Sequence, residues 1–312
     1  MKPDTGTDAA DEAGVVVGTV RRDPLELARL TTPREVHHRM YRHTPSADLT
    51  SLLRRFWIPV WSVPPGEEAP QKVLQDPVCQ VVIGGDYARF YGVAPELSTT
   101  TLTGDGWAVG LTLAPATGYL MAGPAGALND RYVDLEDVLG DDGRVLTDRV
   151  REVMAPDPHD PAAHRASMNA CEDALRRFLP VDAAGELTNT LVAAVEEEPE
   201  ILQVAQICER FDLSERALQR LLRRRLGLTP KCLIQRRRLQ EAAERLREET
   251  TTHADLAAAV GYADQSHMIR DFIHVTGMTP GQFLALQRGG RDAAERRTER
   301  DVSHPHNGQP PR

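Results

Sequence analysis

The chain is poor in the residues from which metal sites, disulfide frameworks and catalytic centres are commonly built. Only four of its 312 residues are cysteines, and their spacing, with no C-x-x-C pair, indicates neither a zinc site nor a set of disulfides. No histidine occurs between His43 and His159, so a metal-binding barrel enzyme would lack its imidazole ligands. G-x-S-x-G turns, phosphate-binding loops and nucleotide-binding glycine motifs are absent as well. We therefore expect no catalytic activity, no cofactor and no metal.

Long apolar runs are also missing from the sequence. The apolar run at residues 15–17 is far too short for a signal peptide or a membrane span, and four acidic residues occur within the first twenty positions. Together with the low cysteine content, this pattern predicts a cytoplasmic protein without a membrane anchor.

Lysine is scarce, and positive charge is concentrated in one part of the chain. Only three of the 37 basic residues are lysines, and 46 acidic residues bring the net charge to −9. Such a balance repels nucleic acid unless the positive charge is gathered in one place. Residues 210–238 hold ten basic and two acidic side chains, so this window carries +8 and the remainder −17. The window is therefore a candidate surface for an anionic partner.

Apolar periodicity divides the chain into parts of different texture and predicts an α+β fold. Short apolar runs broken by glycine, proline and threonine indicate strands, with a tight hairpin at Gly84-Gly85-Asp86. Three- and four-residue apolar spacing later in the chain indicates helices. The predicted parts are a flexible segment (1–40), a β-rich sensor-like or dimerisation domain (41–150), a helical connector (151–195), an all-α DNA-binding domain (196–288) and a disordered tail (289–312).

The strongest signal is an internal repeat at an offset of fifty residues. The segment 220–230 (RLLRRRLGLTP) aligns with 270–280 (RDFIHVTGMTP), sharing an arginine, a large apolar pair, a glycine, a threonine and a proline. A shorter helical segment precedes each copy and ends in a tight turn, at Asp212 and at Gly261, two residue types that tolerate left-handed backbone. This spacing is typical of helix-turn-helix units, so we predict two of them.

Each unit has a second helix with one polar and one apolar face. In the first, Ser214 is a good N-cap, Gly227 ends the helix and Pro230 starts the next. In the second, Met268, Phe272 and Val275 form the apolar stripe. The predicted DNA-binding residues lie at the start or on the polar face of these helices: Ser214, Arg216, Gln219, Arg220, Arg223, Gln265, Ser266, His267 and Arg270.

A linker helix is predicted between the two units, over residues 231–248. Eighteen residues at the usual helical rise span about 27 Å. Successive major grooves on one face of B-DNA lie about 34 Å apart, so a rigid connector of this size can place two recognition helices in neighbouring grooves.

The region 200–288 resembles the DNA-binding region of AraC/XylS-family transcription regulators. The resemblance rests on LSERALQRLL (213–222), GLTP (227–230), RLQEAA (238–243), GYADQSH (261–267), and Arg270, Phe272 and GMTP (277–280). It implies that Arg216, Gln219 and Arg220 of the first helix, and Gln265, His267 and Arg270 of the second, meet base edges or flanking phosphates. Backbone amides near Ser214 and Gln265 would then hold phosphates.

The N-terminal region resembles the small β-rich sensor-like domain that precedes this DNA-binding region in some actinobacterial-type regulators. The matching positions are Phe56-Trp57, residues 77–83, Val109-Gly110 and residues 133–140. If the likeness holds, this domain controls or dimerises the reader that follows it. Trp57, Trp61 and Trp107 could line an effector pocket there or belong to its core.

These observations predict a sequence-specific DNA-binding transcription regulator whose tandem helix-turn-helix units read two successive major grooves. The alternative is a non-specific DNA-associated or protein-interaction module, whose arginines contact only phosphates or an acidic partner. Arg236, Arg237 and Arg238 leave two interpretations open, phosphate contact or a solvated helix face. Double-stranded DNA is the main expected partner. RNA polymerase, an unidentified small-molecule effector and a second copy of the chain are further candidates.

Overall fold

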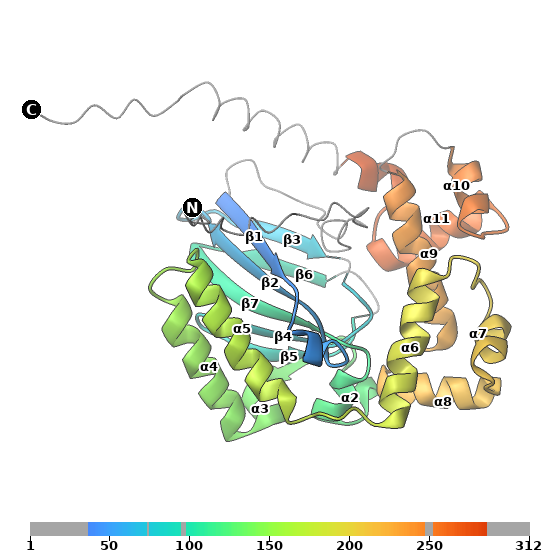
Figure 1. Ribbon diagram of the computed structural model, residues 1–312. Helices are drawn as coiled ribbons and strands as arrows, with labels where there is room; N and C mark the ends of the chain where they lie inside the picture. Colours follow the sequence, from blue (N-terminus) through green and yellow to red (C-terminus); the bar gives the residue numbers. More distant parts are fainter. Residues whose placement is uncertain (1–36, 74, 95–97, 247–251, 286–312) are drawn as a thin grey trace, which may run out of the picture.

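The computed structural model describes residues 37–73, 75–94, 98–246 and 252–285. A β-rich part and a helical part lie side by side (Figure 1). The predicted tail and most of the predicted flexible segment fall outside the described residues, but the first strand already begins at His37, inside the segment predicted to be flexible. The sheet therefore starts earlier than the boundary at residue 41.

The β-rich part is built on one antiparallel sheet of six strands. In spatial order these are β1 (His37–His43), β2 (Leu53–Ser62), β7 (Asp105–Leu113), β4 (Gln80–Gly84), β5 (Ala88–Tyr91) and β8 (Tyr132–Asp134). Two further strands, β3 (Ala69–Val73) and β6 (Ser98–Leu102), pair with each other. The hairpin predicted at Gly84-Gly85-Asp86 joins β4 to β5 and is closed by a 2.8 Å bond from the Gly84 amide to the Tyr87 carbonyl.

Helices cover one face of this sheet. Phe56 lies opposite Leu111 across the β2–β7 ladder, and because strand side chains alternate, both point to the same face. They share a core with α4 (Asp141–Met154) and α5 (Pro161–Arg176), which follow the short helix α3 (Leu135–Leu139). The buried residues Cys171 and Leu175 of α5 belong to this core, so the apolar stripe of that helix packs inside the chain.

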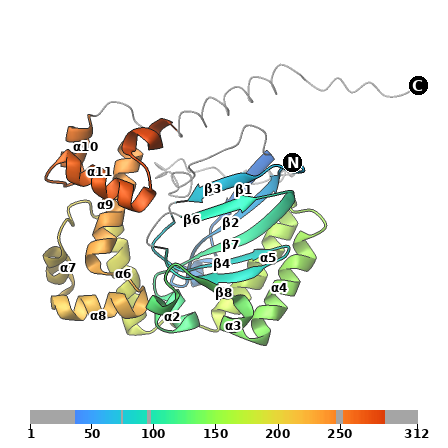
Figure 2. The same ribbon diagram turned by 180° about the vertical axis from the view of Figure 1, so that it is seen from behind.

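The helical part comprises six helices in the described residues. They are α6 (Ala183–Glu197), α7 (Val204–Phe211), α8 (Glu215–Arg225), α9 (Pro230–Leu246), α10 (His253–Ala259) and α11 (Gln265–Thr276). The turns η1 (Ala47–Leu49) and η2 (Ala125–Leu128) and the helix α2 (Thr117–Ala122) complete the molecule. Seen from behind, α2 lies beside one end of α8 (Figure 2). The α+β fold class, with a β-rich domain ahead of a helical one, is thus confirmed.

The two largest hydrophobic cores meet at an unexpected place in the chain. The larger core runs from the sheet through α6, α7 and α8 to Leu233 and Ile234 at the start of α9. The smaller core begins at Leu239, later on the same helix, and closes around α10 and α11. The boundary between the two cores therefore falls within the linker helix. None of the helices in the described part of the chain has the length and apolar character needed to cross a bilayer.

Candidate nucleic-acid interface

The first helix-turn-helix unit has the local geometry that its sequence predicts. Asp212 adopts the left-handed conformation (φ 50°, ψ 46°) and ends α7. Ser214 is the N-cap of α8, where its hydroxyl accepts a hydrogen bond from the Ala217 amide at 3.3 Å. Leu218 and Leu222 are fully buried on the inner side of α8, which turns the opposite face toward solvent.

The predicted residues of the first unit gather on that outer face. Arg216, Gln219, Arg220 and Arg223 are all exposed. With Arg224 and Pro124 they line one surface hollow of about 490 Å³. No ion pair within the described residues involves Arg216, Arg220 or Arg223. Their positive charge is therefore available to an external anion.

Two members of this hollow were missed from sequence. Arg224 follows Arg223 directly, so the basic run itself was the signal that could have identified it. Pro124 comes from the turn before η2 in the β-rich part, about a hundred residues away in the chain, and no sequence pattern connects it to α8. The outer face of α8 is thus bordered by a segment from the other domain.

The second unit repeats the geometry with different caps. Gly261 takes the predicted positive φ of 78°. Asp264 caps α11, with its Oδ1 accepting from the His267 amide at 2.8 Å. Met268 and Phe272 are fully buried and Val275 nearly so, which confirms the predicted apolar stripe. A carboxylate therefore occupies part of the helix start where the backbone amides were predicted to hold a phosphate.

The predicted residues of the second unit are exposed along α11 but form no common hollow with those of α8. Arg270 Nε donates to the Ser266 carbonyl at 3.3 Å, and His267 Nε2 lies 3.7 Å from Asp271 Oδ2. Gln265 and Ser266 are exposed at the start of the helix. The α8 and α11 sets lie toward opposite ends of α9 (Figure 1). The 17 residues of α9 span about 26 Å at the usual helical rise.

Neither interpretation of the arginine run 236–238 is correct for Arg236 and Arg237, which are buried. Arg236 is 2% exposed and donates from Nη1 to the Ala94 carbonyl at 2.9 Å and from Nη2 to the Gln75 carbonyl. Arg237 is buried against the Ile201 carbonyl and Glu241. Burial lowers the pKa of both guanidinium groups. These side chains tie the linker helix to its surroundings, because their neighbours remove them from solvent.

Arg238 has a role of the same kind in the second unit. Its Nε donates to the Val260 carbonyl at 2.8 Å, and its guanidinium lies 3.7 Å from the centre of the Tyr262 ring. The turn of the second unit is therefore fixed to α9 by a hydrogen bond and a cation–π contact.

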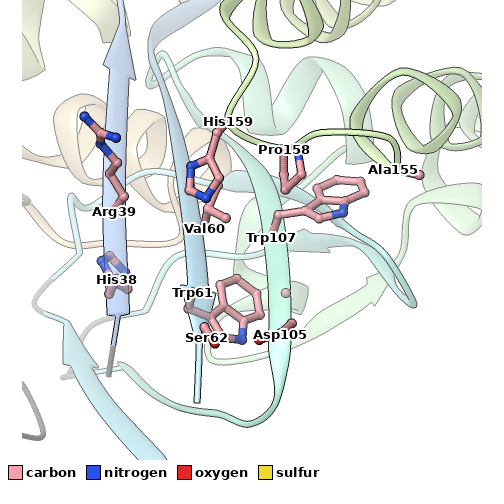
Figure 3. A pocket seen from close by; sticks show the side chains of 11 residues that line it. His38, Arg39, Val60, Trp61, Ser62, Asp105, Trp107, Ala155, Pro158 and His159 are labelled. Atoms are coloured by element: carbon pink, nitrogen blue, oxygen red, sulfur yellow. The ribbon is translucent and has the colours of Figure 1, made fainter. Parts of the chain in front are cut away.

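The β-rich part contains a separate cavity of about 840 Å³, at the end of the sheet and beneath the α4–α5 connection (Figure 3). Two indoles, those of Trp61 and Trp107, line it, whereas Trp57 does not. Cationic or titratable groups at its wall are Arg39, His38 and His159, against one carboxylate, Asp105. The arrangement suits a ligand with an apolar ring and a negative group.

Histidines that are distant in sequence meet near this cavity. The Tyr41 hydroxyl oxygen lies 2.8 Å from His159 Nδ1, and the ring centres of His164 and His43 are 5.6 Å apart. Burial, and then the charge of His164, lower the pKa of His43. Sequence reasoning missed this cluster, because β1 and α5 are brought together only by the fold. Within the described residues, no group of three potential ligands could hold a metal ion.

Two family models match the sequence in separate regions. One is described as a helix-turn-helix domain and matches residues 207–285. Residues 207–285 form an AraC/XylS-type helix-turn-helix domain. The other, described as a domain of unknown function (DUF6597), matches residues 41–134, which include most of the sheet.

Sequence relatives of the chain include transcriptional activators. The chain is 35% identical over 107 residues to the HTH-type transcriptional activator RhaS of Escherichia fergusonii, covering 34% of this chain and 37% of that protein. RhaS of Escherichia coli strain SE11 is 34% identical over 86 residues, covering 28% and 30%. The chain thus spans about a third of the length of these relatives.

Structural neighbours were found at low similarity. ToxT from Vibrio cholerae has a TM-score of 0.37 and 13% identity, covering 81% of this chain and 98% of that one. The C-terminal domain of AraT, a response regulator from Geobacillus stearothermophilus, has a TM-score of 0.30 and 20% identity, covering 34% and 87%. TM-scores below 0.5 do not establish a common fold.

Proposed function

We propose that the protein is a sequence-specific DNA-binding regulator of transcription, in which α8 and α11 read two successive major grooves. The observation that carries the proposal is the exposed face of α8, where Gln219 and three arginines that have no ion-pair partner among the described residues surround one hollow. The predicted DNA-binding residues of α11 are exposed as well. An AraC-type domain that resembles transcriptional activators supports this function.

The chemistry of the two faces fits base recognition. A guanidinium can donate two hydrogen bonds to guanine O6 and N7, and a carboxamide can pair with adenine N6 and N7. Arg216, Arg220 and Gln219 would supply these groups in the first groove, and Arg270 and Gln265 in the second. Ser214, Arg223, Ser266 and His267 would contact the flanking DNA backbone.

Selection of bound fragments from a randomised duplex pool tests the proposal. A defined motif should emerge, and Arg220→Ala should weaken binding to it by about 1–3 kcal/mol and relax base preference at one position. Arg270→Ala should do the same at a position in the other groove. Arg144→Ala on α4, which removes an exposed arginine outside the AraC-type domain, is the matched control and should have little effect.

The competing function is binding to phosphates alone. It predicts no enriched motif, a steep salt dependence and equal losses of affinity on every duplex when an arginine is removed. An acidic protein partner in place of DNA would leave the full-length chain without measurable duplex binding at low salt. Either result would overturn sequence-specific regulation.

We further propose that the cavity beside Trp61 and Trp107 takes a small effector, an apolar aromatic acid. The two indoles would hold its ring, and Arg39, His38 and His159 its carboxylate. Titration with simple aromatic carboxylates should quench tryptophan fluorescence, and Trp107→Phe should remove most of the response. Trp57→Phe, outside the cavity, should keep the response. If Trp57→Phe removed the response and Trp107→Phe kept it, the ligand would bind outside this cavity.

Regulation by such a protein takes place where DNA and RNA polymerase are accessible, so we propose a cytoplasmic location. RNA polymerase and a second copy of the chain are its proposed protein partners. Catalysis, a cofactor and a metal have no place in this function.

A further inference from the structure

The first helix-turn-helix unit is joined to the β-rich domain by a continuous core. Leu218 and Leu222 of α8 belong to the same buried cluster as Phe56 and Leu111 of the sheet. Leu226 and Leu228, which follow α8, belong to it too. The second unit has a cluster of its own around Phe272. Among the described residues, the first helix-turn-helix unit therefore shares its core with the β-rich domain, whereas the second has a separate core.

Tyr119 on α2 makes the most specific contact across this junction. Its hydroxyl accepts two hydrogen bonds from Arg224, at 2.9 Å from Nε and 2.6 Å from Nη2. Its ring centre lies 4.2 Å from the guanidinium carbon of Arg225, which also donates to Asp182 of the α6 N-cap at 2.5 Å. The Arg225 bond lowers the pKa of Asp182, so this carboxylate is charged at neutral pH. One tyrosine thus holds two consecutive arginines of α8.

A second contact fixes Gly227, the residue after the C-cap of α8. Gly227 has a positive φ of 70°, and its carbonyl accepts a hydrogen bond from Asn129 Nδ2 at 2.9 Å. The two segments approach so closely here that a Cβ on Gly227 would lie 2.5 Å from Asn129 Oδ1. The C-terminal end of α8 is therefore held from the side chain of Arg224 to the backbone of Gly227.

We propose that Tyr119 and Asn129 position the first recognition helix for DNA, so that its reading depends on the β-rich domain while that of the second helix does not. The inference rests on the proposed DNA-binding function. In the described residues, α2 and η2 both pack against α8, and the hydrogen bonds of Tyr119 and Asn129 lie at the end of that helix opposite its N-cap. These contacts leave Arg216 and Arg220 exposed.

Positioning matters because base recognition tolerates little displacement. Two parallel hydrogen bonds to a base edge require the helix to be held within about 0.5 Å of its docked position. An eleven-residue helix carries its reading side chains far from its C-terminal anchor. A small tilt at Gly227 therefore moves Arg216 and Arg220 further than it moves the anchored end.

The test uses the full chain and a duplex that contains the selected motif. Tyr119→Phe removes the hydroxyl that binds Arg224 and keeps the ring beneath Arg225. Asn129→Ala removes the bond to Gly227. Tyr132→Phe is the matched control, because Tyr132 is an exposed tyrosine of the same domain that contacts Arg89 and Tyr91 rather than α8. Footprints of Arg220→Ala and Arg270→Ala first assign each groove to one unit.

We expect Tyr119→Phe and Asn129→Ala each to lower affinity by about three- to tenfold, the size of a lost modest hydrogen bond. Protection should weaken in the groove assigned to α8 and persist in the other, with the thermal unfolding midpoint close to that of the control. Unchanged affinity, tighter binding or equal loss in both grooves would overturn the inference. If Arg220→Ala and Arg270→Ala are also silent, it is the proposed function that fails.

Discussion

The first helix-turn-helix unit shares its buried leucines with a β-sheet, whereas the second closes around Phe272 and Met268 on its own. Both units repeat one sequence pattern, with an arginine, an apolar pair and a Gly-x-Thr-Pro ending at the same spacing. The difference teaches that an internal repeat fixes the local turn and helix of each copy but leaves open what stabilises it. One helix-turn-helix unit can thus share a core with the neighbouring β-rich domain while the other has a core of its own.

The largest expected effects come from removing one buried side chain from each core. Leu222→Ala should destabilise the protein by about 2–5 kcal/mol and Phe272→Ala by about 3–5 kcal/mol, because both residues are fully buried. All three tryptophans lie between residues 57 and 107, so their fluorescence follows the β-rich domain. Denaturant unfolding of Leu222→Ala should show the fluorescence transition at lower denaturant.

Phe272→Ala tests whether the two hydrophobic cores unfold independently of each other. It should leave the fluorescence transition in place and shift only part of the far-ultraviolet circular dichroism transition, since its core does not include the sheet. A common shift of both signals in Phe272→Ala would mean that the two cores unfold together, and the difference between the units would then have no energetic meaning.

A pair of glycines sharpens the comparison at the helix ends. Gly227 and Gly277 lie just beyond the ends of α8 and α11, with φ of 70° and 67°. Alanine in this left-handed region costs about 1–2 kcal/mol. Gly227→Ala should cost more than Gly277→Ala, because a Cβ meets Asn129 at the first site and no atom within 4 Å at the second. Equal losses in unfolding free energy would show that Asn129 yields to the added methyl group.

The N-caps give a smaller contrast in the opposite direction. Asp264 accepts at 2.8 Å with a charged oxygen, whereas the Ser214 hydroxyl accepts at 3.3 Å. Replacement by alanine should cost about 0.5–2 kcal/mol at each site, with the larger loss for Asp264→Ala. Amide hydrogen exchange, read separately for α8 and α11, measures the local cost. A larger loss for Ser214→Ala would contradict this order.

The smallest expected effect is a dependence on pH that is confined to the β-rich domain and the first unit. Burial and the neighbouring His164 lower the pKa of His43 from 6.5, so the unfolded chain takes up a proton before the folded one. The stability from neutral His43 is therefore present above pH 6.5 and is lost as the pH falls from there through the folded value. The fluorescence transition should weaken below pH 6.5, and His43→Gln should reduce that slope.

Much of the structure of the two helix-turn-helix units could be predicted from local sequence. The left-handed turns at Asp212 and Gly261, the Ser214 cap and the buried stripes of α8 and α11 all follow from interactions within about one helical turn. The exposed face of Arg216, Gln219, Arg220 and Arg223 follows from the same periodicity. The DNA contacts assigned to these residues and to the α11 set stay predictions.

Longer-range features escaped the same reasoning. The run Arg236 to Arg238 is as basic as the outer face of α8, yet its guanidinium groups bind carbonyls at Ala94, Gln75, Ile201 and Val260. His43 and His164 meet although 120 residues separate them. Both results depend on which segments pack against a helix, and that information is spread over the whole chain.

The sequence by itself determined that this protein has a β-rich domain, two helix-turn-helix units and a positive surface on the first recognition helix. Backbone conformation, capping and helical periodicity depend on neighbours a few residues apart, so they can be read locally. Only the tertiary structure decided that the core boundary lies within α9 and that Tyr119 and Asn129 hold the end of α8. Burial and contacts between distant segments set those outcomes, and they exist only once the chain is folded.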